Sequence, residues 1–161
     1  MKRLLTVLII SFFMVAGCGL GASKYDDAIM DGASNLNTGK TEEALADFNR
    51  AIKIKPQVAA GYLGRANTLN IMGRYEEAIE DYDKTLEINP KLANAYVNRA
   101  SAYSHLGEYE KAIADYEKGL ALDPKIDNSP GFIKRLFSNE PDTDKGIRRH
   151  LEYLKAKVKD S

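Results

Sequence analysis

The fold is decided by residues 93–124, which read ANAYVNRASAYSHLGEYEKAIADYEKGLALDP. Small and apolar side chains recur at helical spacing on both sides of Gly107, and Pro124 ends the stretch. Two amphipathic segments separated by a glycine predict a helical hairpin. The unit recurs upstream with one fixed period, marked by Gly39, Gly73 and Gly107 and by Pro56, Pro90 and Pro124. The sequence therefore predicts three consecutive hairpins.

The repeat resembles the tetratricopeptide-repeat family. The matching features are a small residue in the first helix, the turn glycine, an alanine and an aromatic in the second helix, and the closing proline. In chain order the small residues are Gly32, Ala66 and Ala100, the alanines Ala44, Ala78 and Ala112, and the aromatics Phe48, Tyr82 and Tyr116. The resemblance implies an all-α, right-handed solenoid with repeats at 25–58, 59–92 and 93–126. The first repeat departs from it, with Ala28 where the others carry Tyr62 and Tyr96.

Helical periodicity sets the expected bounds of the elements. The expected helices span residues 24–38, 40 or 41 to 53, 58–72, 75–88, 92–106 and 109–122, with Thr41 as an N-cap. Residues 127–161 are expected to form capping helices that cover the end of the stack. A first one would begin at Ser129 and Pro130, and a last one at Asp142 or Thr143. The last one carries an apolar stripe of Ile147, Leu151, Leu154 and Val158. Asp144, Glu152 and Asp160 dilute the basic charge of its other face, which favours a solvated cap over a helix lying on a membrane.

The start of the chain has the pattern of an export signal. Lys2 and Arg3 precede an apolar run over residues 4–16, which is short for a membrane span. The sequence Val15-Ala16-Gly17-Cys18 resembles a bacterial lipobox, which implies cleavage before Cys18 and lipidation of that cysteine. We therefore expect residues 1–17 to be a signal peptide and 18–24 to be the lipidated cysteine and a short linker. The alternative is an ordinary signal peptide cut elsewhere.

Several classes of function are disfavoured. Basic and acidic residues number 23 each, which argues against nucleic-acid binding. The two histidines and single cysteine show no metal-ligand spacing, and no phosphate-binding loop or catalytic motif is present. We therefore expect no enzyme activity, no cofactor and no metal.

The family resemblance implies a concave groove lined by the first helix of each repeat. Its implied positions are the second, fifth, sixth, ninth, twelfth and thirteenth of each repeat. The polar residues there are Asn67, Asn70, Asn94, Asn98, Ser101, Ser104 and His105. Asparagine offers both a donor and an acceptor to an extended peptide. The family's carboxylate clamp is not expected, because Met30, Gly64 and Asn98 occupy the places of its basic residues. The alternative to a binding groove is a face that is simply exposed to solvent.

These features predict a lipid-anchored scaffold for a protein or peptide partner in the bacterial cell envelope. Residue 19, which follows the cysteine, is glycine and not aspartate. By resemblance to Gram-negative lipoproteins, this permits transfer of the protein to the outer membrane, where it would face the periplasm. The alternative is a structural subunit that self-associates into homo-oligomers. A further hypothesis concerns Arg65 and Arg99, which we expect to link neighbouring hairpins by pairing with Asp47 and Asp81. Asp115 would then pair with Lys134 or Arg135.

Overall fold

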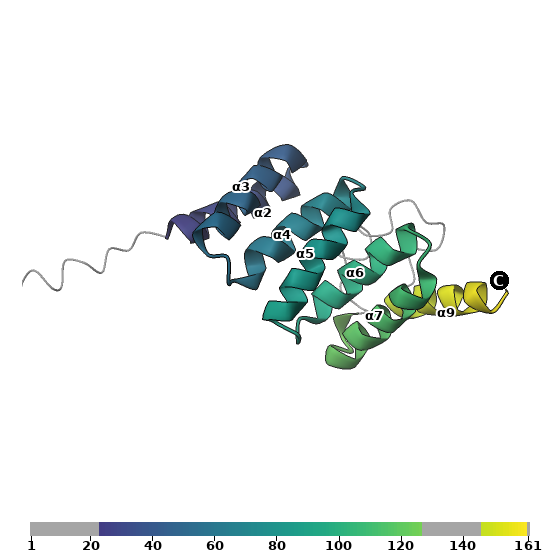
Figure 1. The fold of residues 1–161 in the computed structure, drawn as a ribbon. Coiled ribbons are helices and arrows are strands. Elements are labelled where there is room, and N and C mark those ends of the chain that lie inside the picture. The colour runs from purple at the N-terminus through teal and green to yellow at the C-terminus, as the bar shows by residue number, and fades with distance from the viewer. Residues whose placement is uncertain (1–22, 127–145, 161) are drawn as a thin grey trace, which may run out of the picture.

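The computed structural model describes residues 23–126 and 146–160, and all of its regular elements there are helices. They are α2 (Lys24–Asn37), α3 (Thr41–Ile54), α4 (Ala59–Ile71), α5 (Tyr75–Ile88), α6 (Ala93–His105), α7 (Tyr109–Leu122) and α9 (Gly146–Lys159). The six helices before α9 form three hairpins stacked in chain order (Figure 1). The predicted all-α architecture of three hairpins is confirmed. No helix in the described ranges is long and apolar enough to cross a bilayer.

The turn inside each hairpin explains the recurring glycine. Gly39, Gly73 and Gly107 have φ of 78°, 77° and 78°, a left-handed conformation that side chains with a Cβ rarely adopt. At the second turn, Arg74 N donates to Leu69 O and Gly73 N donates to Asn70 O, and both other turns repeat this pattern. These two bonds satisfy carbonyls that the helix end leaves open. The chain then enters the next helix directly after the turn.

Two helix N-caps differ from the sequence prediction. Thr41 is the first residue of α3 rather than its N-cap, and Lys40 occupies the cap without a side-chain bond. By contrast, Ser23, which was assigned to the linker, caps α2. Asp26 N donates to Ser23 Oγ over 3.3 Å, and Ser23 N donates to the Asp26 carboxylate over 3.2 Å. This capping box fixes the point at which the helix begins.

The three hairpins pack through small residues against aromatic rings. Phe48 is buried between its own hairpin and the next one. A Cβ added at Gly64 would lie 2.2 Å from the Phe48 ring, and one at Gly32 would lie 2.9 Å from it. Alanine takes the place of Gly32 in the later hairpins, where Ala66 and Ala100 are fully buried. The close approach of the helices therefore depends on side chains of minimal size.

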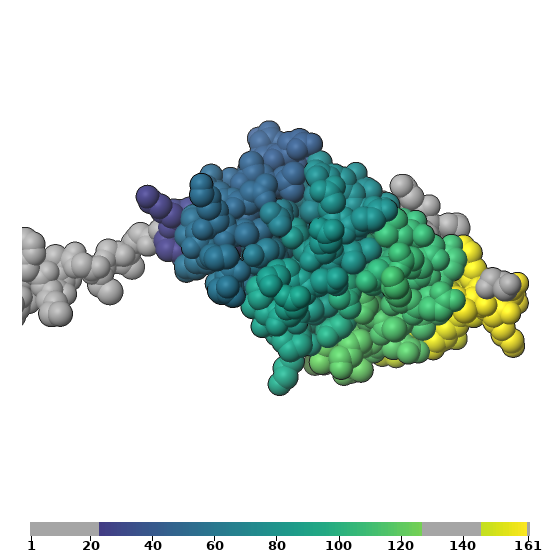
Figure 2. Space-filling view, viewed as in Figure 1, coloured from purple at the N-terminus to yellow at the C-terminus, as the bar shows by residue number. Residues whose placement is uncertain are grey.

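The end of the stack is covered by α9, which packs against α7. Ile147, Leu151 and Leu154 are buried in one cluster with Tyr116 and Leu120, as the predicted apolar stripe required. Lys155 pairs with Glu117 on α7 over 3.0 Å. In the space-filling view, α9 lies at the end of the molecule opposite α2 (Figure 2). The expected helix at Ser129 and the lipobox at Cys18 lie outside the described residues.

Candidate functional site

The first helices of the hairpins, α2, α4 and α6, lie next to one another. In the described part of the chain, α2 contacts α4 and α4 contacts α6, whereas the second helices α3, α5 and α7 approach one another less closely. This asymmetry bends the stack toward the side of the first helices. We call the surface formed by α2, α4 and α6 the first-helix face. It carries all of the residues predicted to bind a partner.

The predicted residues are exposed at the two ends of α6 and buried in its middle. Asn94 and His105 are exposed, and the His105 ring stacks on Tyr75 with centroids 4.6 Å apart. Ser104 is half-buried, with Oγ 3.4 Å from His150 Nε2. Between these ends, Asn98 is 3% exposed and Ser101 is fully buried.

Asn67 and Asn70 on α4 lie close to the buried middle of α6. Asn67 is half-buried, and its Oδ1 accepts two hydrogen bonds: one from Tyr82 Oη over 2.9 Å and one from Asn98 Nδ2 over 2.7 Å. Burial raises the pKa of the Tyr82 hydroxyl, and the neighbouring amides of Asn70 and Asn98 offset part of that rise. The structure therefore joins α4, α5 and α6 through one polar cluster, which we call the Tyr82 cluster: Asn67, Asn70, Tyr82 and Asn98.

The Tyr82 cluster was not predicted from the sequence. The repeat pattern identifies Tyr82 and Tyr116 only as its recurring aromatic residues, and the Tyr82 ring is fully buried. The available signal was the combination of a tyrosine, rather than the phenylalanine of the first repeat, with asparagines on both neighbouring first helices. A buried hydroxyl requires a hydrogen-bond partner, and these amides supply it.

Three polar atoms near this region lack a partner. Asn70 Oδ1, Asn98 Oδ1 and Ser101 Oγ are each buried and make no hydrogen bond with the described residues. Asn70 is 9% exposed. Because burial without a hydrogen bond is costly, atoms of this kind in a native protein call for water or a ligand.

The predicted groove positions of the first-helix face are nearly uncharged, and two of them expose large apolar side chains. Met30 on α2 is 66% exposed and Ile71 on α4 is 45% exposed. Apart from His105, Asp26 is the single ionisable side chain at the predicted groove positions of α2, α4 and α6. The described groove positions therefore hold no lysine or arginine that would pair with a carboxylate.

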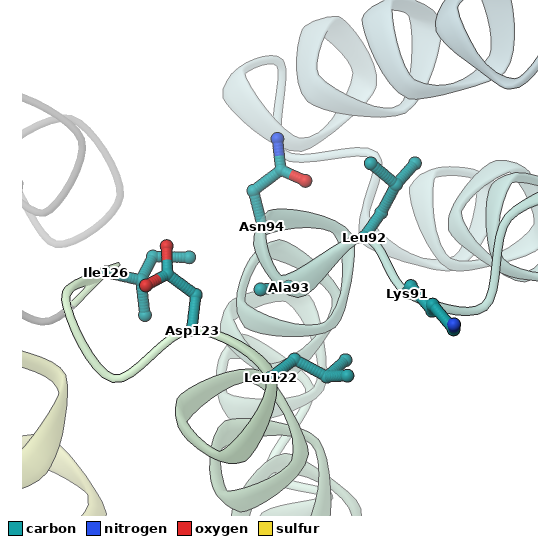
Figure 3. Close-up of a pocket in the computed structure, with 7 residues that line it drawn as sticks. All are labelled: Lys91, Leu92, Ala93, Asn94, Leu122, Asp123 and Ile126. Atoms are coloured by element: carbon teal, nitrogen blue, oxygen red, sulfur yellow. The ribbon is translucent and has the colours of Figure 1, made fainter.

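A cavity of about 460 Å³ opens beside the start of α6. Its lining comes from the first turn of α6, the residues that precede it, and the end of α7 with the turn after it (Figure 3). Asn94 and Leu92 lie on one side of the opening, and Asp123 and Ile126 on the other. Asp123 is already engaged, because its Oδ1 accepts from Lys125 N over 3.0 Å. The cavity therefore extends the first-helix face at Asn94.

The arginine hypothesis is wrong in its pairing. Arg65 Nε and Nη2 donate to the two oxygens of Asp81 over 2.6 and 2.7 Å, inside one hairpin. Arg99 makes the same two-pronged contact with Asp115 over 2.7 and 2.8 Å. Asp115 is therefore partnered within its hairpin, while Lys134 and Arg135 lie outside the described residues.

The remaining nitrogen of each arginine does reach the preceding hairpin. Arg65 Nη1 donates to Asn49 over 2.6 Å, and Arg99 Nη1 donates to Asp83. The arginines thus link hairpins as expected, but through a residue two positions beyond the predicted aspartate.

Asp31 replaces the arginine in the first repeat, and it would repel Asp47 of the same hairpin. Arg50 on α3 removes that repulsion by contacting Asp31 over 2.9 Å and Asp47 over 3.0 Å. Asn35 Nδ2 also donates to Asp47 over 2.8 Å. Each of these arginines is bonded to side chains of the hairpins themselves, so we assign the arginines to the scaffold and keep the first-helix face as the candidate site.

Solved structures with the same fold include tetratricopeptide-repeat domains with bound peptides. The first such domain of Spaghetti (RPAP3), bound to the HSP90 peptide SRMEEVD, aligns with a TM-score of 0.69 and 19% identity, over 88% of this chain and 98% of that one. The TPR2B domain of yeast Sti1 in complex with an Hsp70 peptide gives 0.66 and 24%, over 85% and 99%. The type III secretion translocator chaperone SycD of Yersinia enterocolitica gives 0.66 and 18%, over 86% and 97%. At these identities the likeness establishes the fold.

Sequence models of the repeat give the family. Two models described as tetratricopeptide repeat match residues 32–58 and 57–125. A comparison with proteins of curated function finds no match. Residues 32–125 of the chain therefore consist of tetratricopeptide repeats.

Proposed function

We propose that this protein is a lipid-anchored scaffold of the bacterial cell envelope that docks a protein or peptide partner on its first-helix face. One observation carries the docking part of the proposal. The first-helix face contains buried polar atoms without partners, at Asn70, Asn98 and Ser101, and it exposes the apolar side chains of Met30 and Ile71. A folded protein gains free energy when a ligand satisfies such atoms.

The relatives in fold support the same kind of function. Two of them are described as complexes with an HSP90 or an Hsp70 peptide, and a third is a secretion chaperone. The stacked hairpins offer one extended face, which suits a partner that lies across several helices. The function we propose is binding, without catalysis or a cofactor.

The anchor is proposed from the sequence at Cys18, which follows an apolar run and two small residues. An acyl chain contributes about 0.8 kcal/mol for each buried methylene, so several chains hold a protein firmly to a bilayer. Because α2 begins at Lys24, five residues separate it from Cys18, and the stretch from Cys18 to Lys24 spans at most about 20 Å when extended. The first-helix face would then work close to the membrane surface, in the periplasm if the membrane is the outer one.

Replacement of the cysteine tests the anchor. In the Cys18→Ser variant, membrane fractionation should show either release into the soluble fraction or an uncut precursor of larger mass. Metabolic labelling with a palmitate analogue should mark the wild type and leave the variant unlabelled. A variant that is still processed and still sediments with membranes would contradict the lipid anchor.

Substitution of exposed residues on the first-helix face tests whether a partner docks there. Asn94 and His105 lie on the surface, outside the Tyr82 cluster. The double variant Asn94→Ala, His105→Ala should recover less crosslinked partner from envelope fractions and keep the thermal unfolding of the wild type. Lys118→Ala, an exposed change on α7, is the matched control. Equal recovery from all three proteins would contradict the proposal, and light scattering that shows only self-association would favour the structural-subunit alternative.

A further inference from the structure

The segment that joins the first two hairpins exposes apolar side chains where its counterparts cover them. We call residues 53–58, which read KIKPQV, the first connecting segment, and its counterparts are residues 87–92 and 121–126. Ile54 is 41% exposed and Val58 is 37% exposed. The corresponding side chains of the later segments are half-buried or buried: Ile88, Leu92, Leu122 and Ile126. Large apolar side chains that are exposed together in one short segment indicate a contact surface.

The first connecting segment also differs from its counterparts in charge. Lys53 and Lys55 flank Ile54, both are exposed, and the segment contains no acidic residue. The later segments each hold one acidic residue and one lysine, so their charges cancel. The residues that replace the two lysines there are acidic, polar or apolar: Glu87, Asn89, Ala121 and Asp123. Because all three segments occupy the same place in the repeat, the fold itself does not require the two lysines.

The first connecting segment lies beside the start of α2. Lys55 Nζ is 4.5 Å from the centroid of the Tyr25 ring, and Tyr25 packs in one apolar cluster with Ala51, near the end of α3. Five residues separate Cys18 from Lys24, and the stretch between them spans at most about 20 Å when extended. A lipid on Cys18 would therefore hold this end of the molecule within reach of a bilayer.

We call residues 23–27 and 53–58 the anchor-side surface. Three of its five charged side chains are basic and two are acidic: Lys24, Lys53, Lys55, Asp26 and Asp27. Asp26 is engaged in the helix cap, where Ser23 N and Ser23 Oγ donate to its carboxylate over 3.2 and 2.6 Å. The anchor-side surface thus has an excess of positive charge in a chain whose formal charge is zero.

On these grounds we propose that the anchor-side surface lies on the bilayer and binds anionic phospholipid headgroups. Lys53 and Lys55 donate to headgroup phosphates, and Ile54 and Val58 enter the interfacial layer between them. Anionic lipids attract lysines only within about a Debye length, roughly 8 Å at physiological salt, and the short tether to Cys18 keeps the segment that close. This inference rests on the proposed lipid anchor and specifies which surface of the protein the membrane covers.

Fluorescence quenching tests the contact on the full-length, lipidated protein reconstituted into vesicles. Cys18 is the only cysteine of the chain, and the lipid occupies its thiol, so Gln57→Cys supplies a single thiol for a fluorophore. Gln57 is exposed in the first connecting segment, and Lys125→Cys labels the corresponding exposed position of the third.

The vesicles consist of phosphatidylcholine with brominated acyl chains as the quencher, either alone or with about a third of phosphatidylglycerol. In the anionic vesicles the fluorophore at position 57 should lose about half of its emission or more, whereas the fluorophore at position 125 should keep its emission. In the neutral vesicles the quenching at position 57 should be about twofold weaker or less.

A charge variant tests the role of the lysines. Lys53→Glu installs the residue that the second connecting segment carries, and it should reduce the quenching at position 57 about twofold. Lys118→Glu, an exposed change on α7, alters the net charge equally and should leave the quenching unchanged. Salt at about 1 M shortens the Debye length to roughly 3 Å and should act as Lys53→Glu does. Circular dichroism of each variant confirms that the helices remain.

Flotation of the vesicles separates this inference from the proposed anchor. A protein that floats with the vesicles while its fluorophore at position 57 stays unquenched, or is quenched equally by neutral vesicles, would overturn the inference and leave the anchor standing. Quenching that Lys53→Glu does not change would do the same, and so would photocrosslinking of position 57 to another protein in cells. A protein that carries no lipid by mass spectrometry and floats with neither kind of vesicle would overturn both.

Discussion

The first hairpin and the two that follow it carry an aspartate at the same place in the second helix but neutralise it from different directions. In the second and third hairpins the arginine lies on the first helix and donates two hydrogen bonds to the aspartate of the second helix. The pairs are Arg65 with Asp81 and Arg99 with Asp115. In the first hairpin the crossing residue is Asp31, and Arg50 comes from the second helix itself.

The two arrangements differ in how far they are shielded from water. The Arg99 and Asp115 side chains are 17% and 10% exposed, whereas Arg50 and Asp31 are 51% and 60% exposed. Shielded pairs interact more strongly but leave a costly unpaired charge when one partner is lost. The aspartate of the repeat is shielded in every copy, but its arginine is shielded in the later copies and exposed in the first. We therefore expect this ion pair to contribute less to the stability of the first hairpin.

Removal of Arg99 should have the largest effect. Arg99→Ala leaves the buried carboxylate of Asp115 without its partner and also frees Asp83, so we expect a loss of about 3 kcal/mol in the free energy of unfolding. Urea denaturation followed by circular dichroism measures it.

The matched control for this prediction removes both charges. Arg99→Met combined with Asp115→Leu should restore most of the lost stability, because no unpaired charge stays buried. Equal destabilisation by the single and double variants would contradict the account of a costly unpaired carboxylate.

Arg65→Ala should destabilise by less, about 2 kcal/mol. The Arg65 side chain is 27% exposed, and its third contact is to the neutral Asn49 rather than to a second carboxylate. The measurement is the same denaturation, run beside Arg99→Ala. A larger loss for Arg65→Ala than for Arg99→Ala would break the proposed dependence on shielding and charge.

Tyr82→Phe makes the second hairpin resemble the first, which carries Phe48 at that position. The change removes one donor from Asn67 Oδ1, which keeps its bond from Asn98, so we expect a loss of about 1 kcal/mol at neutral pH. Denaturation at neutral pH checks this value.

The same variant has a pH signature. Burial raises the pKa of Tyr82 above its ordinary 10.0, so the folded protein keeps a proton that the unfolded chain releases above that pH. The corresponding stability is present below pH 10.0 and is lost as the pH rises further. Between about pH 9 and about pH 11, wild type should lose stability more steeply than Tyr82→Phe. Tyr153→Phe, at a half-exposed tyrosine, should follow the wild type, and identical slopes for all three proteins would argue against the buried hydroxyl.

Arg50→Ala should have the smallest effect of the series. The Arg50 side chain is half-exposed and the buried Asp47 keeps its hydrogen bond from Asn35, so the expected loss is below about 1 kcal/mol and should shrink further in high salt. Thermal unfolding at low and high salt measures both. A loss as large as that of Arg99→Ala would mean that the first hairpin is as firmly held as the later ones.

The sequence predicts the helices well because periodicity and glycine act locally. The bounds of α5 and α7 agree with the prediction residue for residue, since each helix begins two residues after a left-handed glycine. The capping box at Ser23 was missed although both of its residues are visible in the sequence, because the linker interpretation of residues 18–24 took precedence.

The side-chain pairings could not be predicted in the same way. Asp31 suggested repulsion inside the first hairpin, and only the folded arrangement brings Arg50 to both carboxylates. Likewise, the sequence places Asn67 and Asn98 on the face of their helices, but it does not give the distance of either from the Tyr82 hydroxyl. Such contacts depend on the angle between hairpins, which no local pattern encodes.

The central claim, docking on the first-helix face at a membrane, is tested most directly by site-specific photocrosslinking in cells. A photoreactive amino acid is placed at Asn94 or Ala33, which are exposed on the first-helix face, or at Ala114, which is exposed on α7. The account predicts a discrete crosslinked product, recovered with membranes, from the first two positions and none from Ala114. Equal products from Ala114, or products that contain only this chain, would contradict it.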